Sequence, residues 1–99
     1  MRSELAVIGV YEQAGARFVD QRFVTPFGEI DLAFEKDGVL ILVEVKSVGD
    51  CGFAEIRLGA RQKRRLINTA EFFLSYLSEV ELRLALVDSR NKVQIFDEF

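Results

Sequence analysis

The feature that most constrains the fold is a pair of apolar segments separated by Lys36-Asp37-Gly38. Segment 29–35 alternates apolar and polar residues, whereas segment 39–46 is almost continuously apolar until it ends in Glu44-Val45-Lys46. Asp-Gly is the strongest short-range hairpin signal, because both residues tolerate the positive φ that a tight turn between two strands requires. The sequence therefore predicts an antiparallel hairpin with a two-residue turn at its tip.

Patterning elsewhere predicts two helices and three further strands around this hairpin. A first helix is expected over 3–14, with Ser3 as its N-cap and Gly15 at the left-handed position that follows a helix. A longer amphipathic helix is expected over 60–78, because its apolar residues recur at helical spacing. The remaining strands are expected over 17–25, 81–87 and 93–96. The order αβββαββ, within one domain spanning 1–99, predicts an α/β fold with a mixed sheet flanked by helices.

The predicted hairpin places four charged residues on one face of the sheet. With a two-residue turn, Asp31 lies directly opposite Glu44, and Glu29 lies opposite Lys46. Like charges on opposed residues, whose Cβ atoms are about 4.5–5.5 Å apart, destabilise a sheet. A divalent cation would turn this repulsion into ligation, and Lys46 would lie beside the same spot. The alternative is a polar patch at a strand end, in which Lys46 pairs with Glu29.

Composition narrows the chemistry that this face could perform. The chain has no histidine and a single cysteine, Cys51, which excludes Ser-His-Asp and Cys-His nucleophiles, Cys/His zinc sites and an internal disulfide. Carboxylates, a lysine or a hydroxyl must carry any catalysis, and a resident metal should be a hard cation bound through oxygen. The lone cysteine and the lack of a signal peptide or a ~20-residue apolar run lead us to expect a cytoplasmic protein without membrane contact.

A basic cluster contrasts with the net charge of −3 and the isoelectric point of about 5.0. Five cations and no acid occur within 57–65, where the second helix is expected to begin. Phosphates bind helix N-termini and arginines, so the cluster is a candidate nucleic-acid contact; the alternative is a solvated helix start. The candidate contacts are Arg57, Arg61, Gln62, Lys63 and Arg65.

Two motifs of the hairpin resemble those of a known family. Asp31 followed by Glu44-Val45-Lys46 is similar to the D…(D/E)xK signature of the restriction-endonuclease-like nuclease superfamily. More closely, Gly28-Glu29-Ile30-Asp31-Leu32 and Leu42-Val43-Glu44-Val45-Lys46 resemble the YraN family of small bacterial proteins, and the resemblance extends over nearly the whole chain. The resemblance implies a restriction-endonuclease-like fold.

The same resemblance implies roles for individual residues. In the superfamily, the aspartate, the glutamate and the main-chain carbonyl between glutamate and lysine bind Mg²⁺; the matching positions are Asp31, Glu44 and Val45. The lysine, here Lys46, assists the attacking water, and Glu4 matches a first-helix glutamate that joins the site in resolvase-like members. The implied function is a Mg²⁺- or Mn²⁺-dependent endonuclease that hydrolyses DNA phosphodiester bonds and, like junction resolvases, selects the structure of its substrate.

Two other classes of function fit the same residues. A nucleic-acid-binding module could keep the fold without cutting, and its binding would be weak and sensitive to salt. A small scaffold could use exposed aromatic side chains to form a homodimer, and a dimer would also suit a nuclease that cuts two strands. Calorimetry with Mn²⁺ separates the binding module from the nuclease, and light scattering tests for the dimer.

Overall fold

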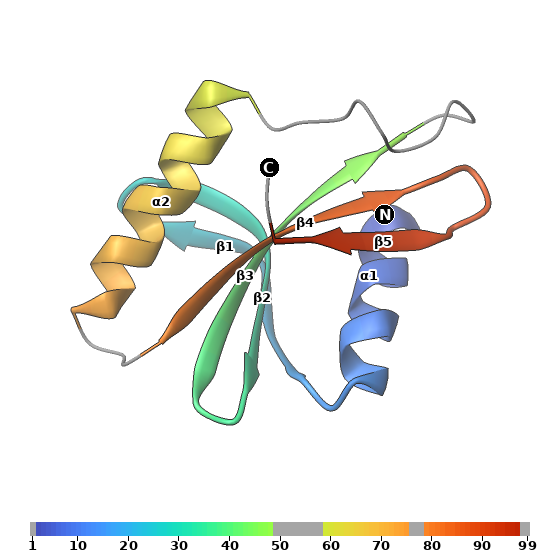
Figure 1. The fold of residues 1–99 in the computed structure, drawn as a ribbon, viewed down its shortest axis with the longest axis horizontal. Coiled ribbons are helices and arrows are strands. Elements are labelled where there is room, and N and C mark those ends of the chain that lie inside the picture. The colour runs from blue at the N-terminus through green and yellow to red at the C-terminus, as the bar shows by residue number, and fades with distance from the viewer. Residues whose placement is uncertain (1, 49–58, 76–78, 98–99) are drawn as a thin grey trace.

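A computed structural model describes residues 2–48, 59–75 and 79–97 (Figure 1). Within these ranges, two helices and five strands follow one another in the predicted order αβββαββ. Their bounds are α1 Arg2–Gln13, β1 Arg17–Thr25, β2 Gly28–Lys36, β3 Val39–Ser47, α2 Ala60–Leu74, β4 Val80–Val87 and β5 Val93–Phe96. The strands form one sheet in chain order, antiparallel except between β3 and β4, which run parallel. This is the mixed α/β arrangement expected of a restriction-endonuclease-like fold.

The β2–β3 hairpin forms in the predicted register. Its strands pair antiparallel from Lys36 opposite Val39 to Leu32 opposite Val43. Asp37 and Gly38 carry the turn with φ values of 53° and 82°, as a tight hairpin turn requires. The predicted register, which places Asp31 opposite Glu44, is therefore confirmed as far as the adjacent pair of Leu32 and Val43.

Alternation along β3 divides the hydrophobic core between the two faces of the sheet. Val43 packs in one cluster with Val7 of α1, whereas Leu42 packs in another with Leu66 of α2. The two helices consequently cover opposite faces (Figure 1). Because β3 lies inside the sheet and is covered on both sides, its residues form a continuous apolar run.

The ends of both helices differ from the sequence prediction. α1 begins at Arg2, so Ser3 lies within its first turn instead of capping it, and the Ser3 hydroxyl forms a hydrogen bond with that of Ser47. α2 ends at Leu74 rather than at residue 78, because the hydroxyl and amide of Ser75 both donate to the Phe72 carbonyl. Residues 76–78 lie outside the described ranges.

Side chains do not alternate strictly at the start of β2, and this corrects one predicted placement. Ile30 and Ala33 are three positions apart, yet both pack in the cluster beneath α2. Gly28 faces the same helix, since a Cβ there would meet an α2 side chain. Glu29, which is exposed, therefore lies on the opposite side from Glu44, and the prediction that they share a face is wrong.

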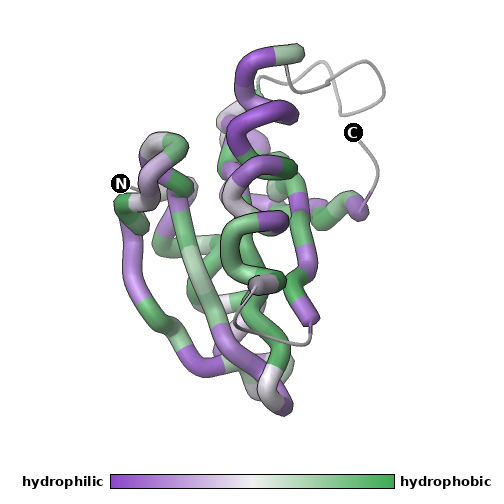
Figure 2. Tube along the Cα trace, turned by 90° about the vertical axis from the view of Figure 1, so that its left-hand side faces the viewer, coloured by the Kyte–Doolittle hydropathy of each residue, from purple (hydrophilic) through white to green (hydrophobic). Residues whose placement is uncertain are grey.

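No helix in the described ranges has the length and apolar character needed to cross a membrane. The first turns of α2 are strongly hydrophilic, whereas the sheet beneath is largely apolar (Figure 2). α2 is thus amphipathic, with its buried residues at Leu66, Thr69 and Ala70.

Candidate functional site

Two carboxylates meet where the β2–β3 hairpin ends, one residue beyond the pair of Leu32 and Val43. The Val45 amide donates a hydrogen bond of 2.8 Å to Asp31 Oδ2, and the Asp31 amide donates one of 3.3 Å to Glu44 Oε1. Each acid is thus bound to the backbone of the opposite strand. The structure brings Asp31 and Glu44 together, as the hairpin register predicts.

Glu44 lies in an unusual electrostatic environment. Only 3% of the residue is exposed, and this burial raises the pKa of its carboxyl from 4.5 to about 6. The charge of Asp31 acts in the same direction on the pKa, whereas the guanidinium of Arg65 opposes the rise. Carboxyl groups perturbed by burial and a like charge occur preferentially at functional sites.

Arg65 supplies a positive charge to this pair from a distant part of the chain. Its Nη2 lies 3.0 Å from Glu44 Oε2, and the Glu44 side chain is only 5% exposed in this ion pair. Sequence reasoning placed Arg65 among the nucleic-acid contacts and missed its pairing with Glu44. The residues are 21 positions apart and belong to different elements, so no local pattern could have indicated the contact.

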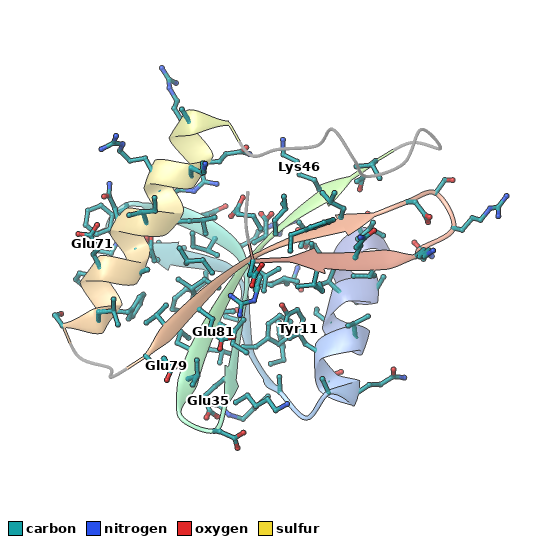
Figure 3. All side chains as sticks on the ribbon, in the orientation of Figure 1. Tyr11, Glu35, Lys46, Glu71, Glu79 and Glu81 are labelled. Carbon is teal, nitrogen blue, oxygen red and sulfur yellow. The ribbon has the colours of Figure 1, made fainter. Side chains whose placement is uncertain are left out.

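Lys46 lies two residues beyond Glu44 on β3, opposite Leu86 of β4, and is partly exposed. Figure 3 shows its side chain near the end of β3. No ion pair connects it with Glu29 in the part of the chain that the structure describes. The polar-patch alternative, which depends on that pairing, is therefore not supported by the arrangement of these two residues.

Glu4 approaches the same end of the sheet but does not join the acid pair. The hydrogen bond between Ser3 and Ser47 connects the start of α1 to the end of β3. Glu4 Oε1 is buried and has no hydrogen-bond partner among the described residues. Over those same residues, no three carboxylates or thiols form a group placed to hold a metal, so Glu4 does not share one ligand set with Asp31 and Glu44.

The donors that do meet suit a hard divalent cation. Mg²⁺ is usually held by one or two protein carboxylates, and water and substrate phosphates complete its octahedral coordination. Asp31 and Glu44 supply two such carboxylates, and the Val45 carbonyl is the third position that the resemblance implies. These two carboxylates are therefore of the kind that Mg²⁺ or Mn²⁺ prefers.

The basic cluster is divided by the helix rather than forming one surface. Arg61 and Lys63 are exposed, and Arg65 lies against Glu44. Gln62 Oε1 accepts a hydrogen bond of 3.2 Å from the Gly59 amide and so closes the first turn of α2. Arg57, like Cys51, lies outside the described residues.

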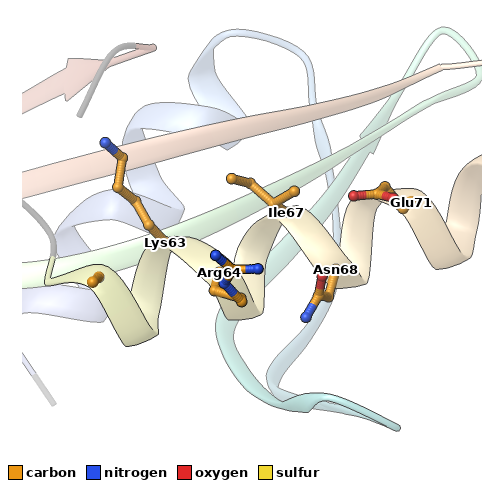
Figure 4. A pocket seen from close by; sticks show the side chains of 6 residues that line it. Lys63, Arg64, Ile67, Asn68 and Glu71 are labelled. Carbon is orange, nitrogen blue, oxygen red and sulfur yellow. The ribbon is translucent and has the colours of Figure 1, made fainter.

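A pocket of about 380 Å³ lies along the outer side of α2 (Figure 4). Lys63 and Arg64 provide two cations at one end, and Glu71 provides an acid at the other. The residues that line it are Ala60, Lys63, Arg64, Ile67, Asn68 and Glu71. Since Arg65 turns inward to Glu44, the cations of α2 lie at two separate sites, the acid pair and this outer pocket.

Comparison with known proteins places these residues within one family. The model of the family described as "Uncharacterised protein family UPF0102" matches residues 3–96, a range that includes both acids and Lys46. A UPF0102 protein of Roseobacter denitrificans is 36% identical over 102 residues, which cover 98% of this chain and 79% of the relative. One of Ruegeria pomeroyi is 34% identical over 100 residues, covering 96% and 81%. One of Vibrio parahaemolyticus is 43% identical over 67 residues, covering 65% of this chain and 54% of its own length. The match with the Vibrio protein therefore spans about half of that relative's length.

Proposed function

Because this chain belongs to the uncharacterised protein family UPF0102, the YraN family, we propose a function from its site: metal-dependent hydrolysis of DNA phosphodiester bonds. The observation that carries the proposal is the meeting of Asp31 and Glu44, each bound to a backbone amide of the opposite strand. Holding two carboxylates together is unfavourable without a cation. A nuclease gains from such a pair, because it presents hard oxygen ligands at the place where a phosphate must be activated.

The residues of the pair and its neighbours divide the chemical tasks. Asp31 and Glu44, with the Val45 carbonyl, would hold the cation, which when bound supplies Lewis-acid polarisation of the phosphate. Lys46 lies two residues beyond Glu44 and orients the attacking water while it offsets the charge that develops on the phosphate. Glu4, the first-helix acid that the resemblance implies, stays outside this set, because among the described residues it forms no ligand group with Asp31 and Glu44.

The DNA would approach over the first turns of α2. Arg61 and Lys63 are exposed there, and exposed cations fix the register of a phosphate backbone without reading its sequence. Because the protein has a net charge of −3, binding by charge alone would be weak, so recognition of a branched or distorted shape would have to supply selectivity. Cleavage would then be structure-selective, as for a junction resolvase.

Cleavage of branched, single-stranded and duplex DNA with Mg²⁺ or Mn²⁺ tests the proposal. Asp31→Asn, Glu44→Gln and Lys46→Met should each lower the rate by about 100-fold or more, as expected when a group that acts on the transition state is lost. Glu29→Gln is the matched control, because it removes a negative charge from the same strand on the side away from Glu44. Activity that survives both Asp31→Asn and Glu44→Gln would rule out this site.

The ion pair of Arg65 and Glu44 favours a second candidate, a nucleic-acid-binding module of the same fold that does not cut. The guanidinium already offsets the charge of Glu44, so the acid pair is tolerable without a metal. Calorimetry with Mn²⁺ distinguishes the two candidates. The binding module is favoured if the wild type binds no Mn²⁺ at millimolar concentration but retains salt-sensitive binding to DNA.

A further inference from the structure

We propose that Arg65 is an exchangeable counterion, which holds Glu44 in the metal-free protein and yields this carboxylate to a divalent cation when one binds. The inference rests on the proposed function, because it concerns the same pair of acids. Arg65 is a positioning residue in this scheme: it acts on the site through Glu44. The ligand class is a divalent cation that prefers oxygen, with Mn²⁺ as the probe.

Arg65 and a cation would compete for the same oxygen. Glu44 Oε1 already accepts the Asp31 amide, and Glu44 Oε2 lies 3.0 Å from Arg65 Nη2. A cation that binds Glu44 through Oε2 would therefore approach the place that the guanidinium occupies. Two positive charges at one carboxylate repel each other, so binding of one weakens binding of the other.

Gly28 allows Arg65 to reach this position. A Cβ built at Gly28 would lie 2.8 Å from Arg65 Cδ, so the side chain crosses directly over the β2 backbone. The Gly28 φ of +122° is also one that residues with a Cβ rarely adopt. Only 29% of the Arg65 side chain is exposed, compared with 68% for Arg17 in its surface pair with Glu35. The contact with Glu44 is therefore built into the fold, in contrast to a surface ion pair.

The pair is nevertheless incomplete, which is why we regard it as exchangeable. Arg65 Nε is buried and has no hydrogen-bond partner among the described residues. A bidentate arginine–carboxylate pair would use two guanidinium donors, whereas one donor contacts Glu44 here. A buried donor without an acceptor is unfavourable. The guanidinium therefore loses less interaction free energy when it leaves Glu44 than it would on leaving a bidentate pair.

Thermal unfolding of the full chain, first without metal and then with millimolar MnCl₂, tests the exchange. Arg65→Gln removes the counterion, and Arg64→Gln is the matched control, because it removes the same charge from the neighbouring residue, which is exposed and lines the outer pocket. Without metal, Arg65→Gln should melt about 10 °C below Arg64→Gln, because Glu44 loses its partner. Mn²⁺ should then raise its melting temperature by about 5 °C more than that of the wild type.

Calorimetry gives a second, independent readout. Arg65→Gln should bind Mn²⁺ about tenfold more tightly than the wild type. This factor corresponds to the loss of one competing charge-assisted hydrogen bond. Arg64→Gln should change the affinity far less. Should Arg65→Gln be unfolded without metal, the double variant Glu44→Gln/Arg65→Gln replaces it in the metal-free comparison. It should melt close to Glu44→Gln alone, because no charge then remains at position 44.

The outcomes separate this inference from the proposed function. Equal melting temperatures of Arg65→Gln and Arg64→Gln without metal would overturn the counterion role. If Mn²⁺ stabilises the wild type and Arg65→Gln equally, the exchange is wrong although the metal site stands. If Mn²⁺ binds neither, the metal-dependent function and the exchange both fail.

Discussion

The Val45 amide donates a 2.8 Å hydrogen bond to Asp31 Oδ2, so a side chain continues the hairpin past its last backbone pair. The same carboxylate lies beside Glu44, whose Oε1 accepts the Asp31 amide. Asp31 is therefore at once a structural link between β2 and β3 and a candidate metal ligand. These two roles can be separated by substitution.

Asp31→Asn should keep the structural role and lose the chemical one. Its amide oxygen can still accept the Val45 amide, whereas Asp31→Ala leaves that amide without an acceptor and should lower the free energy of unfolding by about 1–3 kcal/mol. Both variants should lose DNA cleavage. Urea denaturation measures the stability of each. Equal destabilisation by the two substitutions would show that the hydrogen bond to Val45 contributes nothing measurable.

The buried carboxyl of Glu44 should make the protein less stable as the pH rises. Its folded pKa of about 6 lies above the ordinary value of 4.5, so the folded state holds the proton more tightly than the unfolded state. The stabilisation is present below about pH 4.5 and is lost as the pH rises through about 6, an effect of about 2 kcal/mol. Free energies of unfolding at several pH values, for wild type and Glu44→Gln, isolate this contribution as their difference.

Glu35 provides a control of opposite sign for that experiment. The Gly38 amide, and then Arg17, hold the pKa of this exposed carboxyl below its ordinary value. Its contribution to stability is therefore present above the ordinary pKa and is lost as the pH falls through the lowered one. Glu35→Gln should remove a contribution to the free energy of unfolding that is lost as the pH falls. Glu44→Gln should remove one that is lost as the pH rises. Changes of the same sign would contradict the assigned environments.

Gly28→Ala should destabilise the protein more than Gly38→Ala. Both glycines have positive φ, but a Cβ at Gly38 would meet nothing within 4 Å, whereas one at Gly28 would meet Arg65. Gly38→Ala should cost about 1 kcal/mol from backbone strain, and Gly28→Ala about 3 kcal/mol, because Arg65 must also move away from Glu44. Denaturant unfolding measures both. The excess cost of Gly28→Ala should disappear in an Arg65→Ala background, and its persistence there would point to strain alone.

Exposed cations of α2 should govern the salt dependence of DNA binding. Arg61→Gln and Lys63→Gln should each weaken binding and reduce the slope of log affinity against log salt by about 1 for each phosphate that the protein no longer neutralises. Arg17→Gln is the control, because this exposed cation lies on β1 in a pair with Glu35. Fluorescence anisotropy in EDTA measures binding without cleavage. An unchanged slope in both α2 variants would exclude this surface as the one that binds phosphate.

Much of the fold could be predicted from the sequence, because its signals are local. The Asp37-Gly38 turn determines the register of β2 against β3, which pairs Leu32 with Val43 and leaves Asp31 and Glu44 as the next residue on each strand. Helical periodicity and turn residues likewise indicate the order αβββαββ. These features depend on neighbours within a few residues, so the hairpin register alone indicates that the two acids lie close together.

Only the tertiary structure decided how that pair is neutralised and what surrounds it. Arg65 reaches Glu44 from 21 residues away because α2 packs across the sheet above Gly28, which has no side chain in its path. The loss of strict alternation in β2 turns Glu29 away, and the packing of α2 divides its cations between the acid pair and the outer pocket. The sequence by itself thus determined which acids meet, through short-range pairing. The packing of α2 against the sheet determined that Arg65 neutralises Glu44, because this contact joins residues far apart in the sequence and no local pattern encodes it.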